Sequence, residues 1–155
     1  GIPAEPLFRS RTLGTGVDAV VDAAHPALSR DALAHGMQNY LRTLAFPMIL
    51  VASGREDIVA SRDALCFVRN GSPRMSRVTG TGCMATELLA AFLAVASGEA
   101  AFHAAVVATA FMGIAGEIAE ETAPRGSGSY HIALIDALST ITAEDIVGRI
   151  TLEDA

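Results

Sequence analysis

The chain has 155 residues, of which 51% are hydrophobic and 5% aromatic, and its formal net charge is −6. This length is typical of one domain, and the surplus of acidic residues without any basic cluster argues against a nucleic-acid-binding surface. Small residues such as Ala, Gly and Val dominate the apolar half of the chain, so we expect closely packed helices against a sheet.

The N-terminal part is predicted to contain a short helix, a turn, a strand and a longer helix. The short helix spans Glu5 to Leu13, and the strand spans Val17 to Val21 after the glycine-containing turn at 14–16. The longer helix runs from Pro26 to about Leu44, because apolar residues recur there at near-helical spacing. These residues are Leu28, Leu33, Met37 and Leu41.

Short apolar runs follow and are predicted to be strands. Residues 47–51 form a run that ends at Ser53-Gly54 and is typical of a buried strand. The runs 58–60 and 65–68 are separated by the polar segment 61–64, so we expect them to pair as a hairpin.

The rest of the chain is predicted to be mostly helical. Helices are expected at about 83–96, 100–120 and 130–139, and Thr142 is expected to be the N-cap of a last short helix. Residues 149–152 are predicted to form a closing edge strand. Strands that alternate with helices favour an α/β layer fold over a helical bundle.

No apolar stretch is both long enough and unbroken enough to predict a membrane span. The segment from Ala100 to Ile118 comes closest, but polar residues interrupt it and its many small residues suit a buried helix. The two cysteines, Cys66 and Cys83, have no spacing typical of a disulfide framework. We therefore expect a protein that works in a reducing cytoplasm.

The most informative motif is Val-Thr-Gly-Thr-Gly-Cys at 78–83, directly before a predicted helix. A glycine-rich turn that enters a helix leaves backbone N–H groups free, and the helix adds a partial positive charge there. This arrangement binds anions, most often phosphates, and Cys83 lies beside the expected anion. The alternative interpretation is a tight turn between a strand and a helix, without a ligand.

Further segments accompany this motif in a definite order. Asn-Gly-Ser-Pro-Arg-Met-Ser-Arg precedes it at 70–77, and Ala-Thr-Ala-Phe-Met-Gly-Ile-Ala-Gly-Glu follows one helix later at 108–117. Gly-Ser-Gly-Ser-Tyr at 126–130 then precedes Ala-Leu-Ile-Asp-Ala-Leu at 133–138. Together these segments resemble the hydroxyethylthiazole kinases, thiamine-salvage enzymes of the ribokinase-like superfamily. The resemblance is specific over about residues 53–145.

The resemblance implies a ribokinase-like α/β fold, in which helices flank a layered sheet. Residues 1–155 would be the C-terminal part of a single kinase domain whose N-terminal half is absent, so we expect a fragment that is inactive alone. The implied reaction transfers a phosphoryl group from ATP to the hydroxyl of 4-methyl-5-(2-hydroxyethyl)thiazole, with Mg2+ as cofactor. The family also implies a homo-oligomer, a trimer with substrate sites between subunits.

The resemblance also assigns roles to residues of the motif. Cys83 would be the catalytic base or would position the alcohol, and Gly80 would contact the substrate. The backbone N–H groups of Thr81 and Gly82 would bind phosphate, and Ser53 would contact the nucleotide.

One further role, that of the carboxylate associated with magnesium, would fall to Glu5. The sequence Gly-Ile-Pro-Ala-Glu at 1–5 resembles a Gly-Asn-x-x-Glu motif of the family, although Ile2 stands in place of the asparagine.

Other polar residues are interpreted as structural. His103 and His131 are expected to cap or pack helices, because no nearby spacing indicates a metal site. The acidic residues at 117–121 are expected to be a solvated helix end. Met112 and Gly113 fit either a nucleotide pocket, by resemblance, or helix packing.

Three functions remain open from the sequence. The chain is a kinase portion that is active only within the complete polypeptide, a non-catalytic nucleotide- or phosphate-binding module, or an assembly fragment without a ligand. Binding of ATP separates the third function from the others, and phosphorylation of the thiazole alcohol separates the first from the second.

Overall fold

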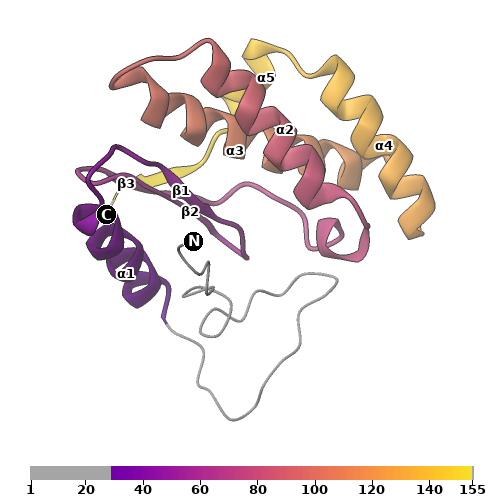
Figure 1. Ribbon diagram of the computed structural model, residues 1–155. Coiled ribbons are helices and arrows are strands. Elements are labelled where there is room, and N and C mark those ends of the chain that lie inside the picture. Colours follow the sequence, from indigo (N-terminus) through magenta and orange to yellow (C-terminus); the bar gives the residue numbers. More distant parts are fainter. Residues whose placement is uncertain (1–28, 155) are drawn as a thin grey trace, which may run out of the picture.

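The computed structural model describes residues 29–154, and Figure 1 shows a sheet with one helix on one side and a layer of helices on the other. The predicted helix at Glu5–Leu13 and the predicted strand at Val17–Val21 lie outside the described residues. The elements in chain order are α1 (Arg30–Thr43), β1 (Leu50–Ala52), β2 (Asp57–Ala60), β3 (Leu65–Val68), the 3-10 helix η1 (Met75–Arg77), α2 (Thr81–Ala94), α3 (Ala100–Thr122), α4 (Ser127–Thr140), α5 (Ala143–Arg149) and β4 (Leu152–Asp154).

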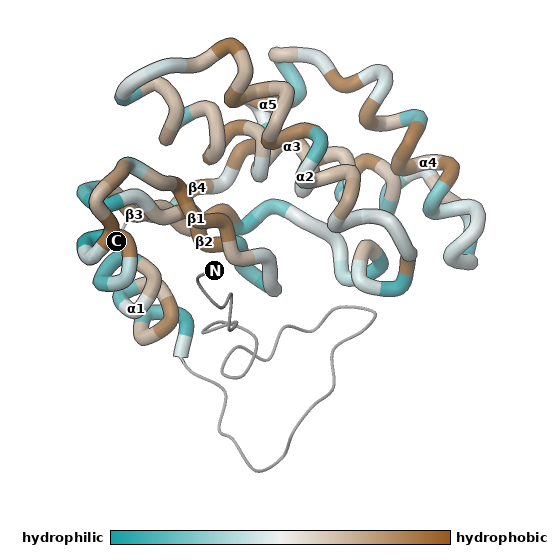
Figure 2. Tube along the Cα trace, viewed as in Figure 1, coloured by the Kyte–Doolittle hydropathy of each residue, from teal (hydrophilic) through white to brown (hydrophobic). Residues whose placement is uncertain are grey.

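The sheet is a meander in which each strand pairs antiparallel with the next, in the order β1-β2-β3-β4. Because successive side chains of a strand point to opposite faces, Ile58 and Phe67 pack on α1, whereas Val59 and Cys66 pack on α3. Figure 2 shows hydrophobic residues in β1 and β2, which lie between these two layers, and also along the helices. The predicted fold class, an α/β layered sheet with flanking helices, is confirmed.

Helix α3 is the central helix of the helical layer. It packs on the sheet through Val106 and Ile114, and on α4 through Met112 and Ala119. By length and composition alone it could cross a membrane, but 56% of its apolar window is buried within the protein. We interpret α3 as a core helix, as the sequence predicts.

The hairpin of β2 and β3 and the N-cap at Thr142 are confirmed. Helix α1, however, begins at Arg30 rather than at Pro26. The reason is local, because Ser29 has an extended backbone (φ −60°, ψ 153°) and its hydroxyl accepts a hydrogen bond from the N–H of Ala32.

The starts of α2, α4 and the edge strand β4 also differ from the predicted positions. Helices α2 and α4 each follow a glycine and begin two and three residues before their predicted starts at 83 and 130. The edge strand predicted at 149–152 is wrong in position, because Arg149 closes α5 and β4 begins only at Leu152. The N–H of Ile150 still donates a helical hydrogen bond to the carbonyl of Ile146 (2.8 Å), so backbone bonding toward β3 begins only at Thr151, whose carbonyl accepts from the N–H of Arg69 (3.0 Å).

Candidate functional site

The motif at 78–83 forms an open turn at the start of α2. Gly80 has a left-handed backbone (φ 98°, ψ −9°), which glycine adopts without strain. The first helical hydrogen bond joins the N–H of Met84 to the carbonyl of Gly80 (3.0 Å), so the N–H groups of residues 81–83 have no partner among the described residues. These free donors and the positive end of the helix favour an anion at this position.

Two side chains of the turn have different roles: that of Thr81 stabilises the turn, and that of Cys83 is accessible to solvent. The hydroxyl of Thr81 donates to the carbonyl oxygens of Val78 (3.3 Å) and Met75 (3.4 Å), so it holds the turn internally. Cys83 is exposed on the first turn of α2. Cys66 is buried between the sheet and α3, and this burial raises the pKa of its thiol. Cys83 is therefore the accessible thiol of the described chain.

The segment that leads into the turn is held by Asn70, a buried polar residue two positions after the end of β3. Its Nδ2 donates to Glu117 Oε1 (3.1 Å) and to the carbonyl of Arg149 (2.9 Å), and its Oδ1 accepts from the N–H of Thr151 (2.8 Å). Glu117 Oε1 also accepts from the N–H of Gly71 (2.9 Å). The sequence analysis includes Asn70 in the segment 70–77 but misses this bonding role, although an Asn-Gly pair shortly after an apolar strand is a signal for it.

The acidic end of α3 is solvated only in part, because Glu120 and Glu121 are exposed, as predicted, whereas Glu117 is half-buried. Besides the bonds of Glu117, a carboxylate oxygen of Glu120 accepts from the hydroxyl of Ser72 (2.6 Å). Glu121 pairs with the guanidinium of Arg149 (2.8 Å), and this hydrogen bond lowers the pKa of the Glu121 carboxyl. The partners lie 28 to 48 residues away in the chain, so no local pattern indicates them.

Helix α3 approaches the segment before the turn closely, and this approach requires glycine. A Cβ on Gly113 would lie 2.6 Å from the carbonyl oxygen of Asn70, which is closer than real Cβ contacts. The carbonyl of Gly116 accepts a hydrogen bond from the hydroxyl of the buried Tyr130 (2.9 Å). Met112 is buried in the same cluster as Tyr130. Met112 therefore packs against α4, and Gly113 lies against the backbone of Asn70.

Ser53 lies exposed at the carboxyl end of β1. Strands β1 and β3 run in the same direction within the meander, so Ser53 and Asn70 lie at the same end of the sheet. The N–H of the next residue, Gly54, donates to Asp57 Oδ1 (2.8 Å). Burial raises the pKa of Asp57 to about 6, and the bond from Gly54 opposes this shift. Within the described residues, no hydrogen bond joins Ser53 to the turn at 80–83.

A protein-held metal site is not formed by the described part of the chain. Among residues 29–154, no group of three or more His, Cys, Asp or Glu side chains is placed to hold a metal ion. Glu5, the predicted magnesium carboxylate, lies outside these residues. His103 Nδ1 lies 3.3 Å from the carbonyl oxygen of Glu99, which is consistent with the expected capping role.

Comparisons with known proteins agree on one family. A model of the hydroxyethylthiazole kinase family matches residues 6–144 of the chain. The hydroxyethylthiazole kinase of Nitratidesulfovibrio vulgaris (strain DP4) is 39% identical over 132 residues, which are 83% of this chain and 48% of that protein. The hydroxyethylthiazole kinase of Syntrophus aciditrophicus is 45% identical over 100 residues, which are 64% of this chain and 36% of that protein.

A solved structure shows the same fold. The hydroxyethylthiazole kinase from Pyrococcus horikoshii superposes with a TM-score of 0.68 at 32% identity, over 81% of this chain and 47% of that one. The chain therefore spans less than half the length of the curated and solved relatives named here.

Proposed function

The chain belongs to the hydroxyethylthiazole kinase family, and on this premise we propose that it provides the phosphate-binding turn and the reactive thiol of a kinase. The proposed acceptor is the hydroxyl of 4-methyl-5-(2-hydroxyethyl)thiazole, and the proposed phosphoryl donor is ATP. The observation that supports this proposal best is the start of α2. Free backbone N–H groups and an exposed thiol lie there within one helical turn.

In the proposed reaction, the hydroxyl oxygen of the thiazole alcohol attacks the γ-phosphorus of ATP. The new O–P bond forms as the bond from the γ-phosphorus to the bridging oxygen of ADP breaks, and the hydroxyl proton leaves. The N–H groups of Thr81 and Gly82 stabilise the charge on the moving phosphoryl group, because they are oriented before the reaction starts. Nothing lies within 4 Å of the place where a Cβ of Gly80 would be, so the substrate can approach the turn there.

The proposed role of Cys83 is to accept the hydroxyl proton or to position the hydroxyl for attack. Ser53 is proposed to contact the nucleotide, and its place at the same end of the sheet as Asn70 supports this assignment. Mg2+ enters the proposal only as the counterion of ATP. Because the described residues form no metal site and Glu5 lies outside them, we assign no protein ligand to it.

We further propose that the protein assembles as a homo-oligomer. Ile132 and Ile135 lie on α4 with 64% and 49% of their surface exposed, and such side chains favour burial in an interface. A cytoplasmic location is part of the same proposal, and the two free cysteines support it.

The proposal is tested by replacing Cys83 in the complete polypeptide that the gene encodes. Cys83→Ala is expected to lower kcat for the thiazole alcohol by roughly tenfold to several thousandfold, the range for loss of a positioned proton acceptor. Cys83→Asp is expected to keep activity, because a carboxylate can take the same proton. Cys66→Ala is the control for removing a thiol, with an expected effect on stability rather than on kcat.

Chemical labelling provides an independent measurement. Iodoacetamide is expected to alkylate Cys83 before Cys66, and ATP together with the thiazole alcohol is expected to protect Cys83. Turnover of Cys83→Ala close to that of the wild type would remove the catalytic role. ATP binding without any transfer in the wild type would support a nucleotide-binding module instead.

A further inference from the structure

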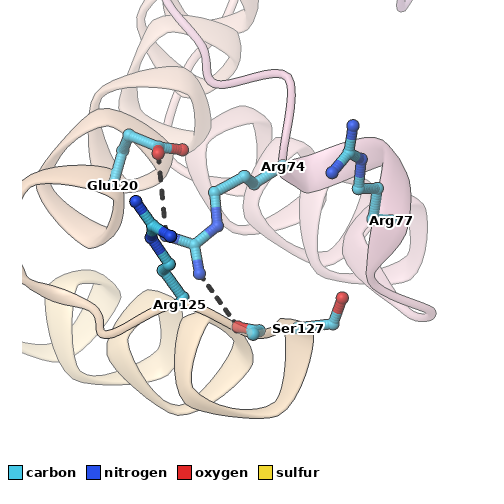
Figure 3. A pocket seen from close by; sticks show the side chains of 6 residues that line it. Arg74, Arg77, Glu120, Arg125 and Ser127 are labelled. Carbon is cyan, nitrogen blue, oxygen red and sulfur yellow. Dashed lines mark hydrogen bonds and ion pairs between the residues drawn. The ribbon is translucent and has the colours of Figure 1, made fainter.

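A basic pocket of about 340 Å3 lies between the segment before α2 and the start of α4. Figure 3 shows Arg74 reaching into it, with Arg77 and Arg125 on either side of Arg74 in this view. The pocket is lined by Arg74, Arg77, Glu120, Arg125, Gly126 and Ser127. No residue of the turn at 80–83 lines it, so the pocket is distinct from the proposed phosphoryl-transfer site.

Arg74 forms the fixed wall of this pocket. Its guanidinium donates to the carbonyl oxygens of Pro124 and Gly126 (2.9 Å each) and lies 3.6 Å from Glu120. It also lies over the ring of Tyr130, 4.6 Å from the ring centroid. These contacts fix the guanidinium of Arg74 through two hydrogen bonds, one ion pair and one ring contact, so we assign it a structural role.

Arg77 and Arg125, in contrast, are exposed and unpaired. Neither side chain forms a hydrogen bond or an ion pair with any described residue. Among the described arginines only Arg55 shares this property, so two of the three unpaired guanidinium groups line one pocket. With Arg74 and Glu120 the lining carries three positive charges and one negative charge, in a chain whose net charge is −6.

The start of α4 adds further donors to the same pocket. Gly126 precedes the helix with φ 127°, and no side chain caps the helix start. The first helical bond joins the N–H of Tyr130 to the carbonyl of Gly126 (3.1 Å), and Ser127 is exposed at the pocket wall. Backbone donors, a hydroxyl and two free guanidinium groups are the chemistry that binds an oxyanion.

We propose that this pocket binds a phosphate group, either inorganic phosphate or the phosphate of a small ester, through Arg77 and Arg125. The planar fork of each guanidinium can donate two parallel hydrogen bonds to phosphate oxygens. The proposal is independent of the kinase reaction, because it depends on residues outside the turn at 80–83.

The test measures phosphate binding by the complete polypeptide with isothermal titration calorimetry, at constant ionic strength set with chloride because salt screens such contacts. Inorganic phosphate and glycerol 3-phosphate, a small ester without a nucleoside, are titrated separately, to distinguish free phosphate from a phosphate ester. Arg77→Gln and Arg125→Gln are each expected to weaken binding of the preferred ligand by about tenfold, as for loss of one charge-assisted hydrogen bond. Arg42→Gln, an exposed arginine on α1, is the charge-matched control and is expected to bind like the wild type.

A negative charge placed at the turn separates the pocket from the turn. Gly82→Glu puts a carboxylate beside the free N–H groups there, where nothing lies within 4 Å of an added Cβ, and is expected to leave phosphate binding in the pocket unchanged. Arg125→Lys keeps the charge and is expected to recover part of the affinity lost in Arg125→Gln. Equal affinities in the wild type and both arginine-to-glutamine variants, or no binding of either ligand at millimolar concentration, would overturn the proposal.

Discussion

Helices α2 and α5 start in opposite ways. At the start of α5, Thr142 and Asp145 form a capping box, in which the hydroxyl of Thr142 accepts from the N–H of Asp145 (3.2 Å) and the carboxylate accepts from the N–H of Thr142 (2.9 Å). At the start of α2, Gly80 offers no side chain, and the first N–H groups stay free. A helix start that caps itself has its first donor bonded to its own side chain, whereas an open one leaves its donors available to a ligand.

The open start needs support from elsewhere in the molecule. Asn70 joins the segment before α2 to Glu117 on α3 and to the N–H of Thr151 before β4. Gly113 allows α3 to lie against the backbone of Asn70. The capped start of α5 therefore depends on a bond between residues three apart in the sequence. The open start of α2 depends on the bonds of Asn70 to Glu117 and Thr151, which lie 47 and 81 residues away.

The aspartates Asp145 and Asp57 make the same kind of local hydrogen bond but have pKa values shifted in opposite directions. Asp145 and Asp57 each accept a hydrogen bond from a backbone N–H three residues earlier, at Thr142 (2.9 Å) and Gly54 (2.8 Å). The pKa of Asp145 is lowered, first by the hydroxyl of Thr142 and then by its N–H. The pKa of Asp57 is raised to about 6, because burial outweighs its single bond. The same local contact thus stabilises one carboxylate and fails to compensate the burial of the other.

The largest expected effect on stability comes from removing the support of the open start. Asn70→Ala deletes bonds to three partners and leaves buried polar groups unpaired, so the free energy of unfolding should fall by about 2 to 4 kcal/mol. Urea denaturation followed by circular dichroism measures this change. Asn39→Ala, an exposed asparagine on α1, is the control. A loss below that of the Thr142 variant described below would show that the open start supports itself.

Asp57→Asn tests the half-buried aspartate. Because the folded pKa of about 6 lies above the ordinary value of 3.8, the folded state binds more protons, and stability falls as the pH rises between these values. Asparagine keeps the acceptor for Gly54 without the charge, so the variant should be more stable at pH 7 by about 1 to 3 kcal/mol. Denaturation at pH 4 to 8 checks this, with Asp63→Asn as the control for net charge. A variant that loses stability at pH 7 would contradict the assigned cause.

Thr142→Ala should have the smallest effect, because it removes only a local cap from a short peripheral helix. The expected loss of unfolding free energy is about 1 kcal/mol at pH 7. The cap stabilises the charged form of Asp145, so its contribution is present above the ordinary pKa of that carboxyl and is lost as the pH falls through the lowered one. Thr122→Ala, at an exposed helical threonine on α3, is the control. If both variants lose equal stability, the capping box contributes nothing specific.

The sequence alone was sufficient for features that depend on neighbouring residues. The hairpin of β2 and β3, the N-cap at Thr142, the glycine turn at 78–83 and the α/β class follow from patterns of a few residues, and the structure contains each of them. The family resemblance, carried by segments of the same kind, is matched over residues 6–144.

Tertiary structure decided the features that depend on which distant residues meet. The acidic end of α3 has bonding partners because the chain brings Asn70 and Ser72 against it. Arg77 and Arg125 share one pocket although they lie 48 residues apart in the chain (125 − 77). The edge strand begins only at Leu152 because α5 extends through Arg149. Local patterns report backbone preference and hydrophobic period, whereas partners, burial and pKa shifts arise only when packed elements exclude water.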